Sequence, residues 1–350
     1  MKQIYVLTSL LMLFTMSLIA QTTVVTTGVA DPYRLELAGN NLYISEFNNG
    51  VISVLNINAS LPTTKSSVIS GLDQPMGIAI KDDFIYIAES GANKISKFDT
   101  TSPSPVLIDV VTGLNVPSGL VFVGNDLYFA ELAGNKISKV DVTVASPAVT
   151  LIKTGLSSPF DIENSGTDLF IAESSVNKVS KIDISTAAYT KTDVVTGLSY
   201  PVALALNGTD LHIAEYFANK VSKIDVTNPT PIATDVVSSL ATPIGLVSNM
   251  GSLFIAEFDA NKISRFDFPT LSTSNFNLQP DFKVYPNPSR GFISVSGLKT
   301  TTNYTIYNSL GAEIMKGNIS ENQKIDIQNL SNDLYFLNLN NGNTFKFLRQ

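Results

Sequence analysis

Short apolar runs recur along the chain at a nearly constant spacing, and each run ends at a glutamate. Typical runs read LYFAE and LFIAE, and successive glutamates lie 42 or 43 residues apart. Because the runs are rich in β-branched and aromatic residues and are bounded by Gly, Asn and Asp, they predict strands joined by tight turns. The glutamates are Glu46, Glu89, Glu131, Glu173, Glu215 and Glu257.

Each repeat has room for four strands. In residues 117–155 the four read PSGLVFV, LYFAE, KISKVDV and VTLIKTGL, with a Gly-Asn-Asp turn between the first two, and a proline begins the first strand of every repeat. Four short antiparallel strands, repeated six times at this period, predict an all-β fold, a six-bladed β-propeller over residues 21–268.

The two ends of the repeat region predict that the ring is closed by an N-terminal strand. The last repeat has no fourth strand after its third, KISRFDF, whereas residues 22–28 match the fourth-strand segment of the other repeats. Pairing of residues 22–28 with that third strand would complete the last sheet and remove an exposed edge. A linear array of repeats gives no reason for this permutation.

The repeat pattern PxGLxx…DLYIAExxxNKISKFD resembles the NHL repeat family over residues 22–268. NHL blades usually carry Asp where this chain has Glu. The first repeat departs further, because Gly50, Val51 and Asn56 stand where the other repeats have Asn, Lys and Asp.

The last seventy residues follow a different pattern. Alternating strands separated by PNP, Asn-Ser and Asn-Gly turns predict a small β-sandwich over residues 281–350, joined to the repeats by a linker at 269–280. This segment resembles the type A C-terminal sorting domain of the type IX secretion system in its YPNP motif, its IYNSLG turn, Leu334-Tyr335 and Arg349. The resemblance implies export across the outer membrane of a Bacteroidota-type cell by the type IX machinery, removal of the tail, and surface attachment or release. A carbohydrate-binding sandwich is the alternative.

The N-terminus predicts a signal peptide over residues 1–20. Lys2 precedes an apolar run that ends in small residues, and cleavage after Ala20 fits the pattern. A transmembrane anchor is the alternative, but hydroxyl residues interrupt the run and make it short for a span. We therefore expect a secreted or outer-surface protein with no transmembrane anchor.

Charge and composition exclude several kinds of partner and site. The chain has a net charge of −7, and residues 21–280 alone carry 25 acidic and 15 basic side chains. Binding to a nucleic-acid backbone requires a basic surface, so no nucleic-acid partner is expected. Cysteine is absent and His212 is the only histidine, which leaves no thiolate site, no catalytic triad and no expected metal or cofactor. His212 replaces a Tyr or Phe found at this position in the other repeats, so we expect it to be packed in the core.

The six glutamates are interpreted as structural. A reaction centre needs different residues in different roles, whereas these are the same in every repeat. We expect each glutamate to pair with a lysine across an exposed hairpin and to contribute little individually.

Two repeats differ from the others along the innermost strand. At the second and fourth positions after the proline, four repeats carry Gly, Ala or Val, whereas the first and fourth repeats carry charges. In a six-fold ring these two repeats face each other across the channel, so the charges are expected at its mouth. They form either a polar plug solvated by channel water or a site that orients a ligand. The four residues are Arg34, Glu36, Asp161 and Glu163.

Aromatic residues gather in the fifth, sixth and first repeats, which are consecutive in a closed ring. They lie in loops expected on one face, where they would form a patch for a glycan or a peptide. The alternative is that each ring fills the groove between its own blades. The residues are Tyr33, Phe47, Tyr200, Tyr216, Phe217 and Phe258.

These observations favour a secreted or surface-displayed, non-catalytic propeller that binds an extracellular protein or glycan through one face. The alternative is a lactonase-like or lyase-like enzyme with a site at the channel mouth. Of the positions at which lactonase-like propellers hold calcium, only Asp161 offers a strong ligand, and the histidines of lyase-like propellers are absent. We therefore expect no catalytic residues. A purely architectural cell-surface protein is a third interpretation.

Overall fold

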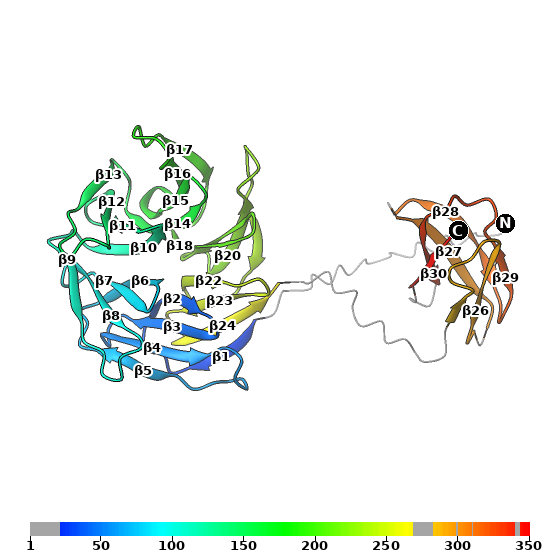
Figure 1. Ribbon diagram of the computed structural model, residues 1–350, viewed down its shortest axis with the longest axis horizontal. Coiled ribbons are helices and arrows are strands. Elements are labelled where there is room, and N and C mark those ends of the chain that lie inside the picture. The colour runs from blue at the N-terminus through cyan, green and yellow to red at the C-terminus, as the bar shows by residue number, and fades with distance from the viewer. Residues whose placement is uncertain (1–21, 269–282, 299, 310, 340–343) are drawn as a thin grey trace, which may run out of the picture. The chain divides into compact units, whose positions relative to one another are not determined.

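The chain divides into two compact units, with the boundary between Phe268 and Pro269. The computed structural model describes residues 22–268 and 283–350, except 299, 310 and 340–343 (Figure 1). The predicted signal peptide and linker lie outside the described residues.

The first unit consists of six four-stranded antiparallel sheets that repeat one arrangement. This confirms the predicted all-β fold of repeated antiparallel sheets. The innermost strands, which each begin at the repeat proline, are β2 (Pro32–Ala38), β6 (Pro75–Lys81), β10 (Pro117–Val123), β14 (Pro159–Ser165), β18 (Pro201–Asn207) and β22 (Pro243–Ser248). The second strands are β3 (Asn41–Glu46), β7 (Phe84–Glu89), β11 (Asp126–Glu131), β15 (Asp168–Glu173), β19 (Asp210–Glu215) and β23 (Ser252–Glu257).

The third and fourth strands complete each sheet on its outer side. The third strands are β4 (Val51–Asn56), β8 (Lys94–Asp99), β12 (Lys136–Asp141), β16 (Lys178–Asp183), β20 (Lys220–Asp225) and β24 (Lys262–Asp267). The fourth strands are β5 (Ser66–Ser70), β9 (Ile108–Thr112), β13 (Thr150–Thr154), β17 (Lys191–Thr196), β21 (Thr234–Val237) and, from the N-terminal side of the first repeat, β1 (Thr23–Thr27). β1 pairs with β24 in the sheet order β1-β24-β23-β22.

The sheets stand around a common centre, with the first strands innermost (Figure 1). Each first strand contacts the first strands of the two neighbouring sheets, and β22 contacts β2. The apolar core lies between the sheets: Tyr86 and Ile95 of one sheet pack with Leu127 and Phe129 of the next. In each second strand, every residue except the first one is buried. Neighbouring sheets cover both faces of the strand. This explains why these strands read as continuous apolar runs.

An asparagine links each of five repeats to the next one. Asn177 has a left-handed backbone, and its Oδ1 accepts a hydrogen bond of 2.9 Å from the amide of Tyr200. The last such residue, Asn261, accepts the equivalent bond of 2.8 Å from Asp31 near the start of the repeat region. The first repeat has Gly50 here, so only a bond from the backbone of Leu72 to the Gly50 carbonyl remains.

The repeated glutamates are buried, contrary to the expectation of exposed pairs. Glu89 accepts hydrogen bonds from the Asp73 amide at 3.0 Å and from the Ser96 hydroxyl at 2.6 Å, and its Oε1 lies 3.4 Å from Lys94 Nζ. The carboxylate thus ties the loop before the first strand to the second and third strands of its own sheet. The backbone contact, which spacing alone does not reveal, accounts for the burial.

The second unit consists of two sheets that share one apolar core, which includes Ile293, Ile306 and Leu337. One sheet contains β25 (Lys283–Tyr285), β26 (Phe292–Ser296) and β29 (Lys324–Asp326). The other contains β28 (Glu313–Ile319), β27 (Thr302–Asn308), β30 (Leu334–Leu339) and β31 (Thr344–Leu348). Within the described part of the chain, no helix is long and apolar enough to cross a membrane.

His212 lies in β19 with only 1% of its surface exposed. Its ring centroid is 5.0 Å from that of Phe268, and its Nδ1 has no hydrogen-bond partner among the residues that the structure describes. Burial lowers the pKa of His212 to about 4, so the side chain is neutral in the folded protein over most of the pH range.

We expect His212→Phe to stabilise the protein, because an unpaired buried polar atom costs about 1–3 kcal/mol. The substitution should also reduce sensitivity to acid. The unfolded histidine binds a proton below its ordinary pKa of about 6.5 whereas the folded one does so only near 4, so the wild type loses stability as the pH falls between these values. Melting temperatures measured across this window check both points. A constant difference between the two proteins at every pH would contradict the titration argument.

Candidate functional site

A cavity of about 170 Å³ lies at the centre of the first unit, and all six first strands contribute to its wall. The four charged residues singled out by the repeat comparison all line it. These are Arg34 and Glu36 from β2, and Asp161 and Glu163 from β14. Because the two strands belong to repeats three apart, the charges meet only when the sheets are arranged around one centre.

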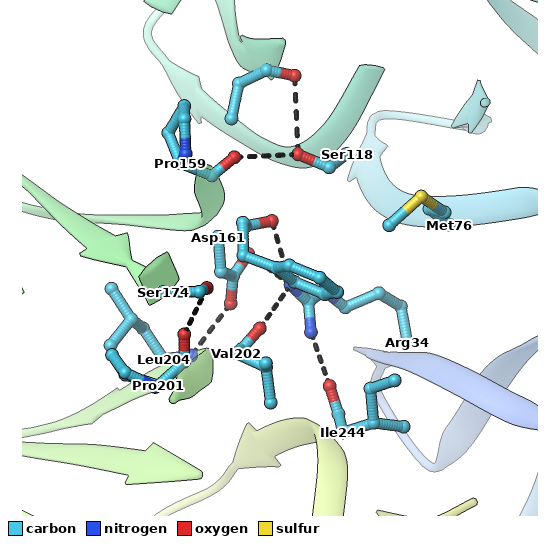
Figure 2. A network of polar contacts seen from close by, with 12 residues as sticks. Arg34, Met76, Ser118, Pro159, Asp161, Ser174, Pro201, Val202, Leu204 and Ile244 are labelled. Atoms are coloured by element: carbon cyan, nitrogen blue, oxygen red, sulfur yellow. Dashed lines mark hydrogen bonds and ion pairs between the residues drawn. The ribbon is translucent and has the colours of Figure 1, made fainter. Parts of the chain in front are cut away.

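The guanidinium of Arg34 crosses from β2 to three other first strands (Figure 2). Its Nη1 donates to the Ile244 carbonyl at 2.6 Å, and its Nη2 donates to the carbonyls of Val202 at 2.8 Å and Phe160 at 3.2 Å. Nη2 also lies 3.2 Å from Asp161 Oδ1. With 5% of its surface exposed, Arg34 acts as a buried cross-link between strands.

Asp161 completes this network. Its Oδ2 accepts a hydrogen bond of 2.7 Å from the Leu204 amide, so the carboxylate connects β14 to β18 as well as to Arg34. Burial raises the pKa of Asp161, although the Arg34 charge opposes the shift. A Cβ at Gly119 would lie 2.6 Å from Asp161 Oδ1. The glycine in the neighbouring repeat therefore makes room for the carboxylate.

Serine hydroxyls join successive repeats around the same centre. Ser45 accepts a bond of 2.9 Å from the Arg34 amide and donates at 2.8 Å to the Met76 carbonyl. Ser174 donates at 2.6 Å to the carbonyl of Pro201 in the next repeat (Figure 2). These bonds fix the strands against which Arg34 packs.

Two aromatic rings stack on each other near the starts of β2 and β14. Tyr33 and Phe160, each one residue before a charged residue, stack with their centroids 6.0 Å apart and their planes at 18°. The Arg34 Cζ lies 5.7 Å from the Phe160 ring centroid. Phe160 did not stand out in the sequence because it lies in the fourth repeat, away from the other aromatic residues.

Glu36 and Glu163 line the remaining wall of the cavity. Both side chains are half-buried by the surrounding strands. Burial, reinforced by the charge of Asp161, raises the pKa of Glu36 to about 8. Burial and the charges of Asp161 and Glu36 raise the pKa of Glu163 well above its ordinary value. Glu36 therefore favours its protonated form at neutral pH.

The six aromatic candidates form two clusters. In the first, the Tyr33 ring lies 4.9 Å from that of Phe47 and 6.4 Å from that of Phe258. Tyr33 is nearly buried at 9% exposure, so Phe47 and Phe258 form the outer part of this cluster.

The second cluster is more exposed. The Tyr200 ring lies 6.0 Å from Tyr216 and 4.9 Å from Phe217, and 69% of the Phe217 surface is exposed. The two clusters adjoin, since Tyr200 and Tyr216 pack against the same apolar core as Tyr33. All six side chains lie in or beside the loops that precede first strands and follow second strands. We call the surface formed by these two sets of loops the proline face.

No group of three or more His, Asp or Glu side chains suited to a metal ion occurs among the residues that the structure describes.

Comparison with known proteins identifies the second unit. Residues 283–349 match the secretion system C-terminal sorting domain family, which confirms the predicted type IX sorting tail. This tail implies export to the cell surface or the medium. Beta-agarase A of Zobellia galactanivorans is 38% identical over 64 residues, which is 17% of this chain. The match spans 12% of the length of that protein.

Solved structures similar to the chain have propeller-like folds. Virginiamycin B lyase from Staphylococcus aureus is 19% identical, with a TM-score of 0.51 over 79% of this chain and 94% of that one. A streptogramin B lyase is 17% identical, with a TM-score of 0.51 over 71% and 87%. A chain of a nidogen/laminin complex is 16% identical, with a TM-score of 0.52 over 60% and 81%. At these identities the likeness establishes the fold alone, and the NHL assignment stays a prediction.

We expect Arg34→Met to lower the free energy of unfolding by about 3–5 kcal/mol, because it leaves the Asp161 carboxylate buried without its cation. Adding Asp161→Asn removes that charge and keeps an acceptor for the Leu204 amide, so the double variant should recover part of the loss. Urea unfolding measures both. Lys139→Met, which breaks a partly exposed pair with Asp126, is the control and should cost about 0–1 kcal/mol. A loss in Arg34→Met no larger than in this control would contradict the account.

The raised pKa of Glu36 predicts that stability falls as the pH rises from about 4.5 towards about 8. Glu36 binds its proton more tightly in the folded protein, so its contribution is complete below about pH 4.5 and is lost as the pH rises towards about 8. Glu36→Gln should therefore flatten the fall in melting temperature over this range. Asp83→Asn, in an exposed turn, serves as the control and should follow the wild type. Parallel curves for all three proteins would show that Glu36 does not titrate as described.

Proposed function

We propose that the six four-stranded sheets are the blades of a closed six-bladed propeller of the NHL type over residues 21–268. The contact of β22 with β2, the place of β1 in the last sheet and the bond between Asn261 and Asp31 support closure. We also propose a signal peptide at residues 1–20 that is cleaved near Ala20, a linker at 269–280 and the sorting domain at 281–350.

We infer that this propeller is exported by the type IX system and binds an extracellular protein or glycan through the proline face, without catalysis. The observation that carries the proposal is the cluster of Tyr200, Tyr216 and Phe217, in which Phe217 is exposed and the two tyrosines are half-buried. Aromatic side chains supply much apolar contact area at low cost in conformational entropy, and exposed groups of them are typical of binding surfaces. A rigid ring of sheets would hold the loops that carry them in place.

The cavity supports a structural role better than a catalytic one. Arg34 and Asp161 are engaged with the backbone of three first strands, β14, β18 and β22, and the only histidine is buried in β19. In S. aureus virginiamycin B lyase, by contrast, replacement of a histidine by alanine gives a catalytically inactive protein.

The alternative is an enzyme whose site is the central cavity. The observation in its favour is the raised pKa of Glu36, which would allow this carboxyl group to donate a proton near neutral pH. In that case turnover would depend on Glu36 and Glu163, and binding would be insensitive to the aromatic loops.

Arrays of peptides and of glycans, probed with the full-length mature protein, test the binding proposal. Tyr216→Ala combined with Phe217→Ala should weaken the strongest signals by about tenfold, the equivalent of roughly 1.4 kcal/mol. The control is Val106→Ala with Ile232→Ala, which trims two exposed apolar residues in the connectors before β9 and β21. Signals that survive in the aromatic variant but are lost in the control, or in Glu36→Gln, would refute binding through the proline face.

A further inference from the structure

Carboxylates stand beside the aromatic clusters of the proline face. Asp31 accepts a hydrogen bond of 2.8 Å from the Asn48 side chain, and its carbonyl accepts one from the amide of Phe47. Asp259 directly follows Phe258 and accepts a bond from the Thr242 hydroxyl. The amide of Thr242 donates a hydrogen bond of 3.0 Å to Asn219 Oδ1, in the loop that holds Tyr216 and Phe217, which places Asp259 close to the second cluster.

Asp31 and Asp259 differ from most acidic residues of the repeats, which form ion pairs with a lysine or an arginine. Each of the six repeated glutamates forms an ion pair with a lysine. Asp126, Asp168 and Asp210 are likewise paired with lysines of the third strands. Among the described residues, neither Asp31 nor Asp259 has an ion-pair partner. Both carry hydrogen bonds from neutral groups only, so their charge is available to a partner.

The proline face has no positive charge in its loops. The loops before the first strands and after the second strands contain no Lys, Arg or His, whereas they include Asp31, Asp73 and Asp259. The lysines that begin the third strands are held by the buried glutamates, and Arg34 lies inside the cavity. Every charged side chain in these loops is therefore acidic.

We propose that the proline face binds a lysine- or arginine-bearing segment of an extracellular protein. This inference rests on the proposed binding function and names its partner class. The faces of Tyr and Phe rings attract cations, and carboxylates next to them supply charge-assisted hydrogen bonds to the same group. Phe217 and Tyr216 provide the rings, and Asp31 and Asp259 provide the charge. A saccharide would gain from the rings, but it would not use the unpaired carboxylates in this way.

The charge can be removed without disturbing the fold. Asp31 has a left-handed backbone with φ of 47°, a conformation that Asn adopts readily. An Asn at position 259 keeps an oxygen acceptor for Thr242. The matched control is Asp82→Asn with Asp83→Asn, in the β6–β7 turn at the opposite ends of these strands, which removes the same charge from the molecule. Comparing the two double variants therefore separates a local site from general attraction to an acidic protein.

The experiment measures binding of the full-length mature protein to a peptide that alternates arginine and glycine. A peptide of the same length with citrulline in place of arginine is the uncharged comparison. The wild type should bind the arginine peptide about tenfold more tightly, and this preference should weaken as salt rises. D31N/D259N should lose most of the preference, whereas D82N/D83N should keep it.

Equal affinity for the two peptides, or equal losses in the two double variants, would overturn the inference. Binding of agar oligosaccharides by the wild type without binding of the arginine peptide would assign the face to glycans and also overturn it. If Y216A/F217A weakens the array signals while D31N/D259N leaves them unchanged, the proline face still binds and only the cationic class fails. If neither variant has an effect, both proposals fail.

Discussion

One buried guanidinium connects four of the six innermost strands of the propeller-like unit. Arg34 reaches the carbonyl oxygens of Phe160, Val202 and Ile244, and its charge is balanced by Asp161. Because taking such charges out of water costs several kcal/mol per ion, the pair is tolerated only where its donors and acceptors are matched. The small residues of the other repeats leave space for it. Arg34 and Asp161 are therefore engaged in holding the strands, which directs the search for function to the surface.

The fold could be predicted because the same strand pattern occurs six times in the sequence. Features shared by all six copies can be distinguished from features of a single copy. The break in the pattern at Arg34 and Asp161 also pointed to the centre. The sequence could not reveal that Phe160 stacks on Tyr33 from three repeats away, since that contact depends on how the sheets meet. The prediction that the repeated glutamates are exposed was wrong, because each accepts a hydrogen bond from a backbone amide 16 residues earlier in the chain.

Conserved and variable positions of the repeats perform different tasks. The positions shared by the repeats, such as Glu89 and Asn177, make bonds within a sheet and between neighbouring sheets. Other positions differ between repeats, and those such as Phe217 and Asp259 lie in the loops of the proline face, where they do not have to satisfy the packing between sheets. Export through the sorting tail places that face outside the cell, where an acidic and aromatic surface can meet a cationic partner.

The most direct test of this account is carboxyl-group footprinting by mass spectrometry on the full-length mature protein, with and without the arginine–glycine peptide. The account predicts that labelling of Asp31 and Asp259 falls when the peptide is present. Labelling of Glu36 and Glu163 in the central cavity should not change. Protection confined to Glu36 and Glu163 would contradict the account and would place the functional site in the cavity.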